Sequence, residues 1–101
     1  MTSEKRKWII EKIANRARRS IDTLTLEIKE EVIKRFECLE RNPFEDDIKK
    51  ISGKKNFYRG RIGEYRYYFR TFPESRSIEI LLFEYRSDIK RKTVQRLKYK
   101  R

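Results

Sequence analysis

The chain has 101 residues, and 28 Lys and Arg against 16 Asp and Glu give it a net charge of +12. This length suits one small domain, spanning 1–101, rather than two. Cys38 is the single cysteine and histidine is absent, which excludes an internal disulfide, histidine-ligated metals and triads that need an imidazole. No apolar run approaches the roughly 20 residues that cross a membrane, and we expect no secretory signal. We therefore expect a cytoplasmic protein with no metal, no cofactor and no membrane partner.

The positive charge is concentrated in the second half of the chain. Residues 1–50 hold 13 basic and 11 acidic side chains, a net +2, whereas residues 51–101 hold 15 and 5, a net +10. Such a field attracts polyanions, and nucleic acid is the most general of these. A solubility charge or an acidic protein partner is the alternative explanation. We expect a nucleic-acid or ribonucleoprotein partner.

The first element of the chain is ambiguous. Residues 1–7 are polar and are expected to fray. Apolar residues at helical spacing favour a helix from about Ala14 to residue 22. Residues 8–13 fit a helix by spacing and a strand by their aromatic and β-branched content. The residues alone leave both structures open for this segment.

Residues 25–41 are the clearest helix in the sequence. Thr25 is suited to cap its start, and Pro43 disfavours helical geometry in the residue before it. One apolar stripe follows the helical period and predicts the face that packs on the core, formed by Ile28, Val32, Phe36 and Leu39.

The period changes after a loop predicted over residues 44–56. Three segments rich in Tyr, Phe, Ile and Arg predict strands over 57–62, 65–72 and 78–85. Gly63-Glu64 is a two-residue hairpin turn in which Gly accommodates a positive φ. The fold class is therefore α+β, with two N-terminal helices on one face of a small, mainly antiparallel sheet. Residues 90–101 are expected to form a basic tail or one short helix.

Arginines recur at every second position of the first two predicted strands. Arg59 and Arg61 share one face of one strand, and Arg66, Tyr68 and Arg70 share one face of the next. If these faces coincide, guanidinium groups suited to phosphate surround a tyrosine suited to stacking on a base. The alternative is the ordinary polar outer face of a half-buried sheet.

The segment 58–66, YRGRIGEYR, resembles the signature of the RelE/ParE toxin superfamily. That signature is an aromatic, two basic residues around any residue, an apolar residue, Gly, an acid, Tyr and Arg. Residues 17–43 resemble the helices of the superfamily, and 51–53 and 85–88 resemble two later elements. The resemblance covers about residues 8–90. It implies a RelE-like fold in which residues 8–13 form an N-terminal strand.

The RelE branch inhibits translation by cutting mRNA in the ribosomal A site, without a metal, and an antitoxin holds it inactive. The resemblance therefore implies an mRNA-cleaving toxin whose partners are an antitoxin, the ribosome and mRNA. Matched residue by residue, it places phosphate binding and transition-state stabilisation on Arg59, Arg61, Arg66 and Arg86. Many members have His and Tyr where this chain has Tyr85 and Lys90. The candidates for acid–base work are therefore Tyr85 or Tyr68, and Lys90 is the candidate for stabilising the leaving oxygen.

Two other functions fit the same sequence. A ParE-like toxin poisons DNA gyrase on the same fold, and a non-catalytic member binds RNA or the ribosome without cleavage. In each case the resemblance implies an antitoxin partner. We expect that partner to dock in apolar grooves between helix and sheet.

Overall fold

The computed structural model describes residues 7–45 and 48–85. Arg86, Lys90 and the predicted basic tail lie outside these residues. The elements in chain order are β1 (Ile9–Ile13), α1 (Asn15–Asp22), α2 (Leu26–Arg41), β2 (Lys49–Lys50), β3 (Phe57–Ile62), β4 (Tyr65–Phe72) and β5 (Ser77–Tyr85).

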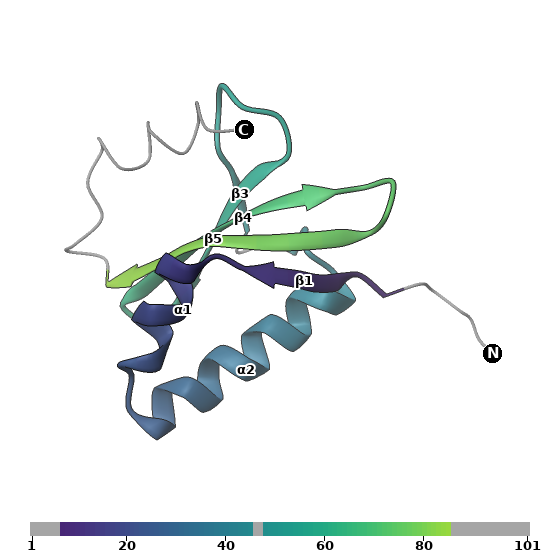
Figure 1. The fold of residues 1–101 in the computed structure, drawn as a ribbon. Helices are drawn as coiled ribbons and strands as arrows, with labels where there is room; N and C mark the ends of the chain where they lie inside the picture. The colour runs from purple at the N-terminus through teal and green to yellow at the C-terminus, as the bar shows by residue number, and fades with distance from the viewer. Residues whose placement is uncertain (1–6, 46–47, 86–101) are drawn as a thin grey trace.

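The strands form one sheet in the order β1-β5-β4-β3-β2, in which β1 runs parallel to β5 and the other pairs are antiparallel. Both helices lie on the same side of this sheet (Figure 1). The predicted α+β class is confirmed. Residues 8–13, whose structure the residues alone left open, contain the N-terminal strand β1 that the resemblance implied, and the short β2 is a correction because it interrupts the predicted loop. No helix of the described ranges is long and apolar enough to span a membrane.

Helix α2 begins and ends where its sequence predicts. The hydroxyl oxygen of Thr25 accepts a hydrogen bond from the backbone N–H of Ile28 at 3.4 Å, which satisfies one donor of the first turn. Asn42, before Pro43, has extended backbone angles and ends the helix. All four residues of the predicted stripe join the core, with Val32 and Leu39 buried and Ile28 and Phe36 partly buried.

The last turn of α2 caps the outer edge of β1. The backbone N–H of Trp8 donates to the carbonyl of Glu40, and the N–H of Ile10 donates to the Glu40 carboxylate, each at 2.8 Å. An edge strand otherwise presents unpaired donors to other chains. One residue of α2 therefore ties the helix to the sheet, through its backbone carbonyl and its side chain, and satisfies part of the exposed edge of β1.

The two faces of the sheet have separate apolar clusters. The helix face carries the larger one, which includes Tyr67, Phe69, Ile80 and Phe83 together with the apolar stripe of α2. The opposite face, which we call the arginine face, carries a small cluster of Ile51, Phe57, Tyr68 and Leu82. The sheet thus packs on both sides, but most heavily beneath the helices.

A β-bulge in β5 determines which way its last residues point. The pairing with β4 shifts after Tyr68, which lies opposite Leu82, because the next residue, Phe69, lies opposite Ile80 and leaves Leu81 extra. Such a bulge reverses the alternation of side chains that follow it. Phe83 consequently joins Ile80 on the helix face, and Leu82 joins the arginine face.

Gly60 and Tyr67 form the central cross-strand pair of β3 and β4 on the helix face. The Tyr67 side chain is fully buried and lies over Gly60, so a Cβ built on Gly60 would overlap the Tyr67 ring, with Cε1 only 2.7 Å away. Absence of a side chain at this position therefore allows a large ring to fill the core between the strand and α2, where it contacts Phe36 at 5.5 Å between centroids.

Replacing Gly60 by Ala is expected to lower the free energy of unfolding by about 1–3 kcal/mol, because the methyl group overpacks the core. Urea unfolding followed by circular dichroism measures the change. Ser52→Ala, at an exposed position, is the control and should stay within about 0.5 kcal/mol of the parent chain. Equal stability of the Gly60→Ala variant and the parent would contradict this packing.

Candidate nucleic-acid interface

The arginines of β3 and β4 lie on one face of the sheet. Arg61 is in register with Arg66, and Arg59 with Tyr68. Residues directly opposite each other in an antiparallel pair point to the same side, with Cα atoms about 4.5–5.5 Å apart. The alternation expected from sequence therefore produces one patch, on the side away from the helices. Arg61 is exposed, and Arg59 and Arg66 are partly buried.

Two lysines extend this patch and were not assigned from sequence. Lys49 of β2 is in register with Arg59 and lies on the same face. The amino group of Lys54 lies 6.0 Å from the centroid of the Phe57 ring. A two-residue strand has no period of its own, so only its pairing with β3 reveals where Lys49 points. Lys49 and Arg59 are both positively charged and repel each other. An anion bound between them would relieve this repulsion.

Arg70 and Tyr68 are held by packing. The Arg70 guanidinium lies 4.8 Å from the ring centroid of Phe72 and 5.7 Å from that of Phe57, distances at which a cation and a ring attract. Tyr68 is only 3% exposed and packs with Phe57 and Leu82. It has little free surface on which a base could stack, so the arginines rather than this ring offer the accessible contacts.

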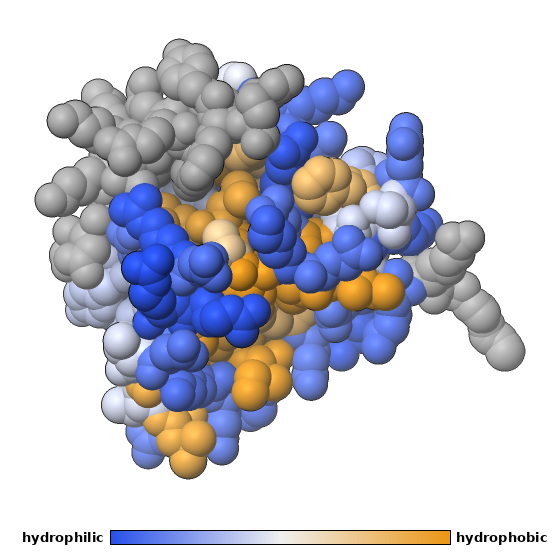
Figure 2. All heavy atoms as spheres, viewed as in Figure 1, coloured by the Kyte–Doolittle hydropathy of each residue, from blue (hydrophilic) through white to orange (hydrophobic). Residues whose placement is uncertain are grey.

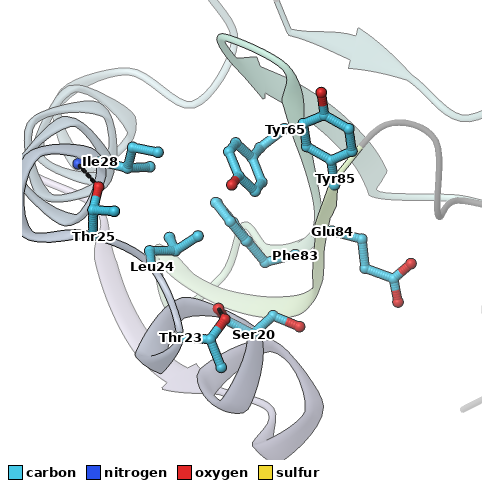
Figure 3. Close-up of a pocket in the computed structure, with 9 residues that line it drawn as sticks. All are labelled: Ser20, Thr23, Leu24, Thr25, Ile28, Tyr65, Phe83, Glu84 and Tyr85. Carbon is cyan, nitrogen blue, oxygen red and sulfur yellow. Dashed lines mark hydrogen bonds between the residues drawn. The ribbon is translucent and has the colours of Figure 1, made fainter.

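The structure does not bring Tyr85 to the arginines. Tyr85 is in register with Tyr65, on the helix face, and the two rings meet edge to face at 5.3 Å between centroids. Both border a cleft of about 480 Å³ between the helices and the ends of β4 and β5 (Figure 3). Apolar side chains of Leu24, Ile28 and Phe83 line its base. Apolar residues also reach the surface at the start of α2, where Leu26 is exposed (Figure 2).

Two carboxylates of β5 accompany the cations on the arginine face. Glu79 is in register with Arg70, and Glu84 with Arg66. Each also forms an ion pair with the N-terminal segment: Glu79 with Lys12 at 3.9 Å, and Glu84 with Arg16 of α1 at 3.7 Å. Sequence analysis missed Glu84 because strict alternation from Ile80 would turn it to the helix face.

The arrangement suits recognition of a phosphodiester chain. Fixed guanidinium groups donate paired hydrogen bonds to phosphate and stabilise negative charge that develops on it. They remain protonated, so proton transfer requires another group. Among residues 7–45 and 48–85 there is no cluster of three or more side chains suited to hold a metal ion.

Replacing Arg61 by Ala is expected to weaken binding of single-stranded RNA and to lower the slope of log affinity against log salt by about 1, because one phosphate contact is lost. Fluorescence anisotropy at several salt concentrations measures both quantities. Lys34→Ala is the matched control, since it removes one exposed cation from α2 on the other side of the sheet. Equal effects of the two variants would contradict a phosphate site on the arginine face.

Comparison with solved structures finds toxins of one kind. The archaeal RelE–RelB complex from Pyrococcus horikoshii OT3 matches with a TM-score of 0.68 and 21% identity, over 84% of this chain and 100% of that one. The toxin–antitoxin complex RelBE2 from Mycobacterium tuberculosis matches with a TM-score of 0.65 and 25% identity, over 81% and 93%. The isolated E. coli RelE toxin matches with a TM-score of 0.66 and 17% identity, over 90% and 98%.

No model of a protein family matches the sequence, and neither does any curated protein. The likeness therefore comes from three-dimensional structure, and it spans nearly the whole length of the solved chains. The chain has the fold of the RelE-like toxins, and the resemblance to this superfamily predicted from the hairpin motif is confirmed.

Proposed function

We propose that this protein is the toxin of a type II toxin–antitoxin pair and that it inhibits translation by cleaving mRNA on the ribosome. The observation that carries the proposal is the register of β3 and β4, which places Arg59, Arg61 and Arg66 together on the face away from the helices. The solved structures with this fold include three RelE toxins in complex with their antitoxins. The proposed substrate is mRNA on cytoplasmic ribosomes.

In the proposed reaction the ribose 2′-OH attacks the adjacent phosphorus. The bond between O2′ and phosphorus forms, and the bond between phosphorus and O5′ breaks. The products are a 2′,3′-cyclic phosphate and a 5′-hydroxyl. Arg61 and Arg66 hold the non-bridging oxygens and stabilise the charge of the phosphorane, and Arg59 with Lys49 binds a neighbouring phosphate.

The remaining candidates keep the roles that the resemblance implies. Arg86 and Lys90 lie outside the described residues, and their proposed contacts with phosphate and the leaving oxygen rest on the motif alone. Tyr85 would have to act from the helix-face side of β5, because its ring packs on Tyr65. Arg70 and Tyr68 support RNA binding chiefly by shaping the floor of the site, since both are packed.

The proposed antitoxin docks in the cleft between the helices and the ends of β4 and β5. This cleft joins apolar side chains to five hydroxyl groups, those of Ser20, Thr23, Thr25, Tyr65 and Tyr85. Such a lining suits an amphipathic segment that buries its apolar face and satisfies hydroxyls at its border. An acidic segment would gain in addition from the net charge of +12.

Primer extension on translated mRNA tests the proposed activity. The parent protein should cut messages on the ribosome and leave 2′,3′-cyclic phosphate ends, and a 2′-deoxy substitution at the cut site should abolish the cut. Arg66→Ala should slow cleavage by about 10²–10³-fold, because one charge-stabilising donor is lost from the transition state. Lys34→Ala should cleave like the parent.

Intact messages in the presence of folded, ribosome-bound protein would overturn the proposed cleavage. Accumulation of cleaved DNA–gyrase complexes would instead assign a gyrase-poisoning toxin on the same fold.

A further inference from the structure

We infer that Glu84 is the general base that removes the proton from the attacking 2′-OH. This inference rests on the proposed function and supplies a group that the arginines cannot. A carboxylate accepts a proton readily, whereas guanidinium groups stay charged and only donate hydrogen bonds. The assignment is based on the position of Glu84 beside Arg66 in the sheet.

The first step of the argument is the register. Arg61, Arg66 and Glu84 are consecutive members of one row across β3, β4 and β5. Neighbouring strands lie about 4.8 Å apart, so the outer two backbones of the row are about 10 Å apart. A phosphate held by the two arginines thus has its ribose within reach of the carboxylate at the end of the row.

The second step is the bulge at Leu81. Because the bulge reverses the alternation, Glu84 lies on the arginine face and Tyr85 on the helix face. In Figure 3 the Glu84 side chain leaves β5 on the side away from the Phe83 ring. Among the described residues, the arginine face therefore gains a carboxylate opposite Arg66, where an unbroken register from Ile80 would have placed Phe83.

The third step is how Glu84 is held. Its carboxylate lies 3.7 Å from the Arg16 guanidinium of α1, and its side chain is 15% exposed. Among the described residues, the charged groups that face it include Arg16 from α1 and Arg66 from β4, and Tyr65 and Tyr85 border the cleft next to it. A carboxylate oriented by a neighbouring cation, with limited access to water, is placed to take a proton from a bound hydroxyl.

Water balances the protons that are transferred in the proposed step. Glu84 takes the 2′-OH proton as O2′ bonds to phosphorus, the O5′ leaving group takes a proton from water, and the protonated Glu84 returns its proton to water. The step therefore needs no metal and no second carboxylate.

Single-turnover cleavage by the full-length protein on programmed ribosomes tests this assignment. Glu84→Gln, which keeps the shape of the side chain, should lower the rate by about 10²–10⁴-fold. A parent that uses this carboxylate as its base should lose rate at acid pH, and the Gln variant should not show that loss. Glu84→Asp should recover part of the rate. Unchanged circular dichroism and ribosome binding would show that the Gln variant is folded.

Two matched controls separate chemistry from structure. Glu79→Gln removes the other carboxylate of β5 on this face, which also pairs with a cation of the N-terminal segment, and should cleave like the parent. Arg16→Met removes the cation that orients Glu84 but keeps the carboxylate, so it should lower the rate much less than Glu84→Gln does. If Arg16→Met lost as much activity as Glu84→Gln, the carboxylate would be a structural anchor and the assignment would fail.

A substrate with sulfur in place of O5′ distinguishes a base from an acid. Sulfur leaves without being protonated, so a defect in a general acid would be rescued, whereas a defect in the general base would persist. Persistence in Glu84→Gln supports the assignment, and rescue overturns it. If the parent cleaves mRNA and the Glu84→Gln variant cleaves at the same rate, this inference is wrong and the proposed function stands. If the parent does not cleave mRNA, both are wrong.

Discussion

The packing of the Tyr67 ring over Gly60 is the contact on which the rest of the site depends. It joins β3 and β4 at the centre of the sheet and leaves only one register in which the large ring faces the helices. A slip of one residue would turn every side chain of a strand to the opposite face. The arginines reach their common face because the aromatic residues between them are anchored in the core, so the position of the cations is set by apolar packing.

The charge on the arginine face changes from positive to negative across the strands, from β2 to β5. Lysine and arginine side chains dominate β2, β3 and β4, whereas the carboxylates of Glu79 and Glu84 lie on β5. A phosphodiester chain is negative at the phosphates and neutral at the ribose. The gradient therefore favours phosphates over β3 and β4 with the sugars turned toward β5, which is the orientation that cleavage through a 2′-OH requires.

Local patterns predicted much of this fold, and pairing decided the rest. The stripe of α2, its Thr25 cap and the Gly63 turn, whose φ is +58°, all follow from side-chain periodicity and backbone sterics. β2 is too short to show a side-chain period. The strand within residues 8–13 forms because this segment pairs with β5. The bulge at Leu81 and the burial of Tyr68 depend on contacts between distant segments. Alternation alone would therefore turn Glu84 to the helix face, and it left Tyr68 available for stacking.

The bulge also places two proposed activities one residue apart. Glu84 faces the arginines, and Tyr85 faces the cleft that we assign to the antitoxin, yet Glu84 borders that same cleft. A segment seated against Tyr85 and Phe83 would press on the strand that carries the carboxylate and on the α1–α2 turn. Inhibition by such a segment would then need no contact with the arginines: displacing the end of β5 would be enough to separate the base from the phosphate, since proton transfer depends on hydrogen-bond distance.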